Sequence, residues 1–273
     1  MIFLELLTIF LALVLGLLVG SFLNVCIHRW PRDESVVAPR SHCPHCGKQI
    51  ALYDIIPVVS YILLRGRCRS CQAPISIRYP IVEILNGLLF AYLVARFGLQ
   101  PLTFKLAVFV SMMLVLIFTD LSEYILPDEI TLGGLVLGIV LSPFLPIQPV
   151  LAPVFWFFTG VQPPLWAISL TESLFGALLL GGLLYTVGEV YYRVRHMEGL
   201  GLGDVKMMAM VGAFWGMADA FMILIWGAII GAVTGVLIVL IGRKEWSYAL
   251  PFGSYLGVTA ILVAIWRSGI LAS

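Results

Sequence analysis

The sequence has few charged residues. Only 11% of its 273 residues are Asp, Glu, Lys or Arg, whereas about a quarter are charged in soluble globular proteins. Hydrophobic residues make up 61% of the chain, which excludes an ordinary soluble domain and indicates an integral membrane protein. The 16 basic and 15 acidic residues give a net charge of +1, so no global basic field favours nucleic acid as a partner.

The first apolar stretch lacks the features of a cleaved secretory signal. No basic residue precedes it, Glu5 lies within it, and its apolar run is longer than the roughly 7–15 residues typical of such signals. Val25 stands where cleavage before a lipid-modified Cys26 would need a small residue. We therefore expect residues 1–26 to form a retained membrane span.

Apolar stretches recur along the rest of the chain. A membrane helix needs about 20 apolar residues to cross about 30 Å of hydrocarbon, so the pattern predicts an all-α polytopic membrane protein with about eight transmembrane helices. Residues 27–80 form one small polar domain between helices 1 and 2, and residues 81–273 form a bundle of about seven helices. The predicted spans are 1–26, 81–97, 103–119, 129–145, 171–192, 203–217, 219–242 and 250–267, with the sixth and seventh divided around Asp219.

Small residues recur at four-residue spacing within these spans. Such spacing lets helix backbones approach closely in lipid, where the hydrophobic effect does not drive helix association. We expect close helix contacts at these positions and no catalytic role for them. The residues are Gly16/Gly20, Gly134/Gly138, Gly212/Gly216 and Gly227/Gly231/Gly235.

The placement of Lys and Arg predicts the orientation. Basic residues in short loops stay cytoplasmic, and thirteen of the sixteen fall on one side if the amino terminus lies outside. Both termini are then periplasmic or external. The 146–170 segment contains no basic residue, so it is expected to be external, with its aromatic residues at the membrane interface.

Four of the five cysteines form two C-x-x-C pairs in the polar domain. The pairs are separated by 21 residues, a spacing typical of paired knuckles that hold one Zn²⁺. Disulfides or a redox pair are the alternatives, but a cytoplasmic location disfavours stable disulfides and one redox pair would not need a second. The sequence predicts a structural zinc site with Cys43, Cys46, Cys68 and Cys71 as ligands.

Carboxylates at span ends are a second set of candidates, because ionisable residues near the membrane are costly. Asp120 ends the third span, and Asp128 follows at the start of the fourth, where we expect it to cap the helix by accepting the amides of Ile130 or Thr131. The motif 199–206 (GLGLGDVK) presents Asp204 after three alternate glycines. It is no nucleotide loop, because no strand precedes it and no Gly-Lys-Ser/Thr follows.

Asp120 and Asp204 are predicted to lie at the same cytoplasmic surface. Two carboxylates that share a site cannot both ionise easily, so one keeps its proton. The ionised member can then activate water, while the protonated member supports the scissile carbonyl and the leaving amine. The four histidines lie in polar segments without a nucleophile elbow, so a Ser-His-Asp site is disfavoured.

These motifs together resemble the type IV prepilin peptidase family. The resemblance extends in order over nearly the whole chain. It includes residues 20–29 (GSFLNVCIHR), 39–46 (PRSHCPHC), 54–57 (DIIP), 66–71 (GRCRSC), 75–80 (ISIRYP), Glu83, 119–120 (TD), 126–128 (LPD) and 201–204 (GLGD). The 146–170 segment looks longer than is usual in the family.

The resemblance implies a GxGD-type aspartic protease of the bacterial cytoplasmic (inner) membrane. Such enzymes cut the basic leader from prepilins and type II secretion pseudopilins at the cytoplasmic face, and many then methylate the new amino terminus, often Phe, with S-adenosylmethionine. By position, Asp120 and Asp204 would be the catalytic pair. Asp128, Gly201, Gly203 and Lys206 would belong to the supporting loops, and the four cysteines would bind structural zinc.

The methyl-donor site is not identified by any motif. Asn24, Asp54 and Glu83 are candidates among the polar groups, although Asp54 could cap a local helix and Glu83 could pair with Arg78. Three alternatives stay open: a peptidase without methyltransferase activity, a small transporter that uses the carboxylates, and a zinc-containing scaffold. The particular prepilins and the oligomeric state are not predicted.

Overall fold

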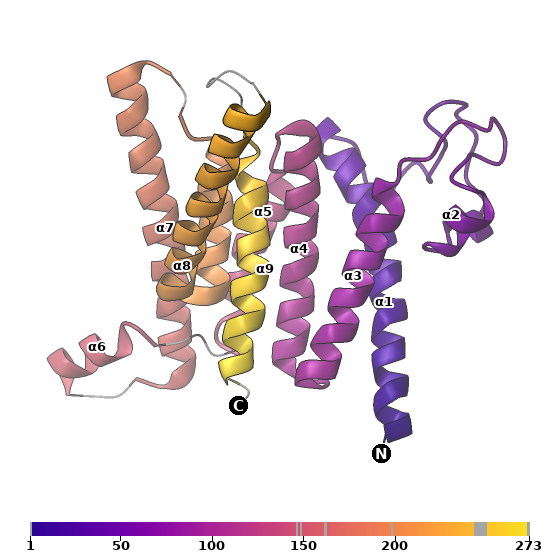
Figure 1. The fold of residues 1–273 in the computed structure, drawn as a ribbon. Coiled ribbons are helices and arrows are strands. Elements are labelled where there is room, and N and C mark those ends of the chain that lie inside the picture. The colour runs from indigo at the N-terminus through magenta and orange to yellow at the C-terminus, as the bar shows by residue number, and fades with distance from the viewer. Residues whose placement is uncertain are drawn as a thin grey trace. The chain divides into compact units, whose positions relative to one another are not determined.

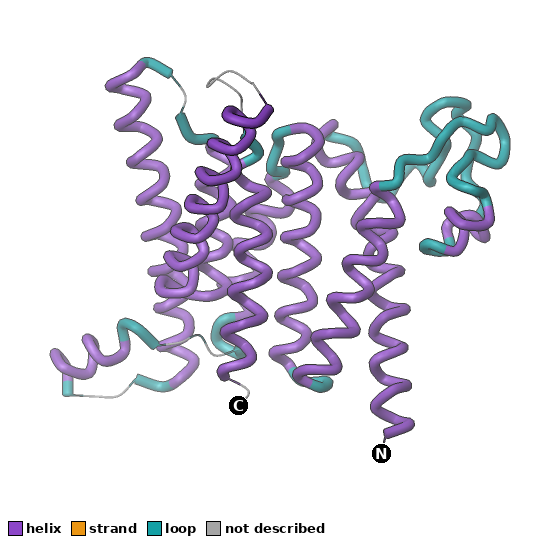
Figure 2. Tube along the Cα trace, viewed as in Figure 1, coloured by secondary structure: helices purple, strands orange, loops and turns teal. Residues whose placement is uncertain are grey.

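The computed structural model describes residues 2–145, 147, 149–160, 163–197, 199–242 and 250–271. These residues contain helices and no strand, as Figure 2 shows. The helices are α1 Ile2–Arg29, α2 Val59–Leu63, α3 Arg78–Phe97, α4 Pro101–Glu123, α5 Asp128–Leu141, α6 Ala152–Thr159, α7 Leu165–Arg195, α8 Leu202–Gly242 and α9 Phe252–Leu271, with short 3₁₀ turns at Trp30–Arg32 and Leu52–Ile55.

Five described helices are long and apolar enough to cross a membrane. They are Ile2–Arg32, Arg78–Phe97, Pro101–Glu123, Leu165–Arg195 and Leu202–Ile241, and Phe252–Trp266 is a shorter apolar helix. The all-helical membrane class predicted from the sequence is therefore confirmed. The count of eight spans stays a prediction.

The chain divides into two compact units, Met1–Val115 and Leu116–Leu271. In the first unit, α1 and α3 are antiparallel and their backbones nearly touch. A Cβ on Gly16 would lie 2.8 Å from the Asn86 carbonyl oxygen, and one on Gly20 would lie 2.7 Å from the Glu83 Cα. The Asn86 side chain donates to the Gly16 carbonyl at 2.7 Å. The predicted close contact at this glycine pair is confirmed.

In the second unit, glycines also bring helices into contact. A Cβ on Gly212 of α8 would lie 2.4 Å from the Gly176 carbonyl oxygen of α7, and Gly181 faces Ala209 further along the same pair. Gly227, Gly231 and Gly235 in the second half of α8 face Leu256, Tyr255 and Leu250 in the same way. In each case the residue numbers rise along one segment as they fall along the other. Helix α7 is therefore antiparallel to the first half of α8, and the second half of α8 is antiparallel to α9.

Helix α8 reverses its direction at Gly216. Forty-one residues in a straight helix would extend about 60 Å, twice the thickness of the hydrocarbon layer. Gly216 has φ 75° and ψ −176°, a conformation that glycine adopts without a Cβ penalty. The turn lies three residues before Asp219, around which the sequence predicts the division into two helical segments. Figure 1 shows the second half returning to the end where α8 begins.

The segment before α7 is anchored at the opposite end of the second unit (Figure 1). Glu172 of α7 is fully buried, and its carboxylate accepts the amide of Val150 at 2.5 Å and also that of Leu151. Ser169 accepts the Ile147 amide at 3.2 Å. Buried polar groups need such partners, so Glu172 and Ser169 hold the described part of the 146–170 segment on α7.

Replacement of Gly212 by Ala should destabilise the α7–α8 contact, because the new Cβ meets backbone atoms that cannot move away. We expect a loss of about 1–3 kcal/mol, measured as a lower midpoint of thermal unfolding in detergent. Gly182→Ala is the matched control, because Gly182 lies on α7 with no atom within 4 Å of its Cβ position. Equal midpoints for the two variants would contradict this packing.

Candidate functional site

One end of the second unit collects the candidate carboxylates. Figure 1 shows the last turns of α4 and α7 and the first turns of α5, α8 and α9 at this end. Asp120 lies three residues before the end of α4, and Asp204 is the third residue of α8. Both predicted aspartates therefore lie at helix ends and not at helix centres.

Asp120 is buried and firmly held. It is 6% exposed, and its Oδ2 accepts the Ser254 backbone amide at 2.6 Å and the Ser254 hydroxyl at 2.8 Å. Ser254 lies in the first turn of α9, 134 residues away in sequence. No local pattern marks Ser254, so sequence reasoning missed it.

Asp204 lies close enough to Asp120 for their charges to interact. Its amide donates to the Gly201 carbonyl at 3.1 Å, and its carboxylate accepts a hydrogen bond from the Gly201 backbone. The carboxylate thus reaches back to the amide that starts α8, as the third-position residue of a capping box does. The structure thus brings the two aspartates of distant motifs together.

Leu126 fills the space between the loops that carry these residues. A Cβ on Gly203 would lie 3.0 Å from the Leu126 Cβ, and a Cβ on Gly253 would lie 2.9 Å from a Leu126 methyl group. Gly203 precedes Asp204 and Gly253 precedes Ser254, so both glycines are needed for the approach of the loops. Gly201 has no such tight contact. The atom nearest to a Cβ built on Gly201 would be an Asp204 carboxylate oxygen at 3.5 Å.

Asp128 binds Lys206 instead of capping α5. The Lys206 ammonium donates to both Asp128 oxygens at 2.7 and 2.8 Å. Pro127 occupies the cap position, and its carbonyl accepts the Ile130 and Thr131 amides at 3.2 and 3.1 Å. The expected capping role of Asp128 is therefore wrong, because its carboxylate is used by a lysine 78 residues away. An exposed pair of this kind adds at most about 1 kcal/mol, and it links the first residue of α5 to the start of α8.

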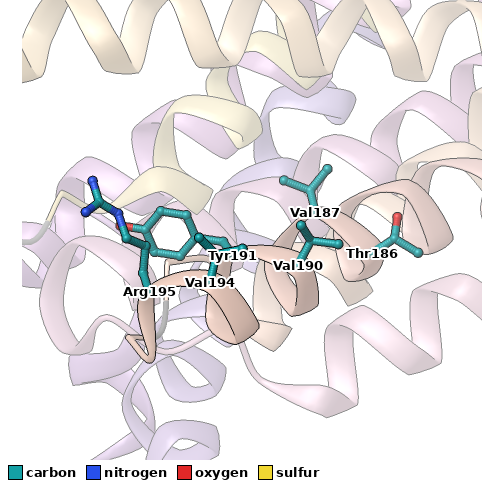
Figure 3. A pocket seen from close by; sticks show the side chains of 6 residues that line it. All are labelled: Thr186, Val187, Val190, Tyr191, Val194 and Arg195. Carbon is teal, nitrogen blue, oxygen red and sulfur yellow. The ribbon is translucent and has the colours of Figure 1, made fainter.

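A shallow apolar groove lies on the last turns of α7 (Figure 3). Its volume is about 490 Å³, and its lining residues are Thr186, Val187, Val190, Tyr191, Val194 and Arg195. The Tyr191 ring lies 2.4 Å from the Cβ position of Gly199, so the groove borders the glycine loop. It contains no carboxylate, and it is therefore distinct from the end of the unit that carries Asp120 and Asp204.

The four predicted cysteines in the first unit come together. Their sulfurs all lie within 4.8 Å of one another, and Cys43 Sγ lies 3.8 Å from Cys71 Sγ. Tetrahedral zinc with Zn–S bonds of about 2.3 Å places ligand sulfurs about 3.8 Å apart. All four are free thiols, so the disulfide alternative does not occur. The cluster could hold one zinc ion.

Two loops of the same construction present these thiols. The Cys43 amide donates to the Lys48 carbonyl, and the Cys68 amide donates to the equivalent Ala73 carbonyl. The fifth position of each loop has positive φ, at Gly47 and Gln72. Amide hydrogen bonds from Cys71 and then Ser70 lower the pKa of Cys68 to about 6, which favours the thiolate that a metal requires. The donor set therefore fits structural zinc.

The three candidates for the methyl donor have different surroundings. Asp54 forms an ion pair with Arg69 at 2.7 Å, and the Arg69 guanidinium lowers the pKa of Asp54 below its usual value. Glu83 is buried and accepts the Val58 amide at 2.8 Å, not Arg78 as the sequence left open. Asn24 donates to the Tyr79 carbonyl, and its own carbonyl oxygen is buried without a partner among the described residues.

Comparisons with known proteins match two parts of the chain to peptidase families. Residues 14–97 match the bacterial peptidase A24 N-terminal domain, and residues 107–236 match the type IV leader peptidase family. No solved structure matches the chain.

Several curated relatives are named prepilin leader peptidase/N-methyltransferase. The one from Stutzerimonas stutzeri is 33% identical over 96% of this chain and 92% of its own length. The one from Pseudomonas aeruginosa is 31% identical over 93% and 89%. The one from Myxococcus xanthus is 41% identical over 83% of this chain, which spans 62% of that relative's length. The chain belongs to the type IV leader peptidase family.

Metal analysis by mass spectrometry tests the thiol cluster. Protein purified in detergent without chelator should contain about one zinc per chain, and Cys68→Ser should lower that content about tenfold because one of four thiolates is lost. Cys26→Ala is the control, since Cys26 is buried in α1 away from the cluster. Wild type without zinc, or Cys68→Ser with full zinc, would contradict the site.

Proposed function

We propose that this chain removes the basic leader from type IV prepilins and type II secretion pseudopilins at the cytoplasmic membrane face and then methylates the new amino terminus. The curated relatives carry both activities in their names. The approach of Asp120 and Asp204 at one end of the helical unit supports the peptidase activity. The resemblance noted from the sequence gives the substrate class.

Hydrolysis by this pair follows from the charge of two neighbouring carboxylates. One aspartate is ionised and takes a proton from water, whose oxygen attacks the scissile carbonyl carbon. The other is protonated and donates a hydrogen bond to the carbonyl oxygen. When the C–N bond breaks, this second proton goes to the leaving amine. Asp128, Lys206, Gly201 and Gly203 support the loops that hold the pair.

The substrate's chemistry suits a site at a helix end. A prepilin carries a basic leader followed by an apolar helix, so the helix can lie in lipid while the leader stays in the aqueous phase. Glu123 is exposed at the end of α4, near Asp120, and can attract the leader. Asp128, which is paired with Lys206, is a second candidate, and Glu198 lies outside the described residues.

The orientation in the membrane follows from the basic residues. Several apolar helices and the named relatives fit a protein of the bacterial inner membrane. We infer about eight spans, with both termini periplasmic and with the thiol cluster and aspartates on the cytoplasmic side. Carboxylates at helix ends disfavour a transporter, whose coupling sites lie near the midplane.

Two of the three candidate residues have the chemistry that a binding site for the methyl donor needs. S-adenosylmethionine carries an ammonium and a sulfonium, and it supplies the methyl group when bound. Glu83 and Asn24 lie one turn apart along the α1–α3 contact, and they offer a buried carboxylate and an unpartnered amide oxygen. Unpartnered buried acceptors are rare, so we infer that these two residues contribute to the donor site.

Intact-mass analysis of a co-expressed prepilin tests the function. Wild type should remove the leader and add the mass of one CH₂ group, whereas Asp120→Asn and Asp204→Asn should leave the substrate uncut, with activity at least about 1,000-fold lower. Asp33→Asn, an exposed change in the thiol domain, should cleave normally. Cleavage without added mass would support the peptidase-only alternative, and cleavage by either Asp→Asn variant would reject the pair.

Calorimetric binding of S-adenosylhomocysteine tests the donor residues without relying on activity. Glu83→Gln should weaken binding about tenfold or more, because a buried charge-assisted contact is lost. Asp54→Asn should bind normally, since Asp54 is occupied by Arg69. Equal affinities for Glu83→Gln and wild type, both folded, would exclude Glu83 from the site.

A further inference from the structure

The first turn of α9 holds Asp120 as an external helix cap. Ser254 is the third residue of α9, and its amide lies 2.6 Å from Asp120 Oδ2 and 3.2 Å from the Pro251 carbonyl. Amides in the first turn of a helix have no carbonyl partner within the helix. They are commonly accepted by the side chain of the N-cap residue of the same helix. Pro251, which precedes α9, has no side-chain acceptor. The carboxylate of Asp120 on α4 accepts the Ser254 amide instead.

The Ser254 hydroxyl adds a second donor to the same oxygen. It lies 2.8 Å from Asp120 Oδ2 and 3.2 Å from the Ile117 carbonyl. Ser254 is 5% exposed and Asp120 is 6% exposed, so water screens these contacts little. Both bonds fall on Oδ2, which leaves Oδ1 to accept a proton from a water molecule.

These contacts distinguish the two aspartates. Asp120 receives two donors from Ser254, an amide and a hydroxyl, and such hydrogen bonds stabilise a carboxylate anion. Asp204 receives a backbone donor from Gly201 in its own helix cap. When one proton is shared by the pair, the member with the stronger anion-stabilising contacts gives it up.

We propose that Ser254 is a positioning residue that keeps Asp120 ionised and leaves the shared proton on Asp204. This inference rests on the proposed peptidase function. Asp120 Oδ1 takes a proton from water as the water oxygen bonds to the scissile carbon. Asp204 gives its proton to the leaving nitrogen as the C–N bond breaks, and the proton held by Asp120 restores Asp204 for the next cycle.

The described residues in contact with Asp120 allow a pH test. Asp204 faces it from α8, and the group that faces it from α9 is the neutral Ser254. Asp128 of α5 is neutralised by Lys206 of α8. A change in the ionisation of Asp120 therefore shifts the acidic limb of the kcat/KM profile, which reports the general base of the free enzyme.

The experiment compares purified Ser254→Ala and Ser254→Thr with wild type on one prepilin, with kcat and KM measured across pH. Ser254→Ala should lower kcat about 10-fold to 100-fold with KM changed less than about twofold. Its acidic limb should move to higher pH, because a lost donor makes the anion harder to form. Ser254→Thr keeps the hydroxyl and should restore both the rate and the limb.

Ser122→Ala is the matched control. Ser122 lies on α4 two residues after Asp120, and its hydroxyl bonds to carbonyls of its own helix. It should behave as wild type. Thermal unfolding of each variant in detergent establishes that it is folded, and the pH profile of Ser254→Ala remains decisive if the threonine variant does not fold.

The outcomes separate this inference from the proposed function. If Asp120→Asn or Asp204→Asn still cleaves, the peptidase assignment itself fails. If both are inactive but Ser254→Ala keeps the wild-type rate and acidic limb, the role of Ser254 is overturned. A limb that moves to lower pH would also overturn it, because Ser254 would then not stabilise the Asp120 anion.

Discussion

The contact between the backbones of Gly176 and Gly212 is the constraint on which the second unit depends. In lipid, helices gain stability from close packing and not from exclusion of water, so α8 can approach α7 this closely only where neither carries a Cβ. That approach fixes the first half of α8, and the turn at Gly216 sends the second half back along α9. The first turns of α8 and α9 therefore meet at the same end as the end of α4, and this is where Asp204, Ser254 and Asp120 come together.

The sequence predicts the parts of this structure that local patterns encode. Apolar length gives the helices, glycine spacing gives the close contacts, and the two C-x-x-C pairs give the thiol cluster. It does not predict contacts between distant segments. Ser254 and Asp120 are 134 residues apart, and a serine in an apolar helix has no pattern that marks a partner. The predicted capping role of Asp128 was wrong for the same reason. Its carboxylate could cap α5 locally or bind the distant Lys206, and the sequence does not show which of the two occurs.

The thiol cluster has a different physical basis from the helical bundle. Its domain has little regular secondary structure, and its described loops use a few backbone hydrogen bonds and the four converging sulfurs. A segment this small cannot bury enough apolar surface to fold by packing alone, so a metal held by the four sulfurs would supply the missing stability. Glu83 then ties this domain to the bundle, because its buried carboxylate on α3 accepts the amide of Val58. A bound metal would thus order the loops, and Glu83 fixes where they attach.

Two carboxylates in one site have different chemical roles only when their surroundings differ. Here the difference arises from the order of the helices and not from the residues themselves, since both are aspartates near helix ends. Asp204 lies in the first turn of its own helix, where its carboxylate serves its own backbone. Asp120 lies in the last turn of α4, where the helix dipole disfavours an anion, and it is stabilised only because the start of α9 is placed against it. The reversal at Gly216 that returns the chain to this end therefore also gives the two aspartates their different surroundings.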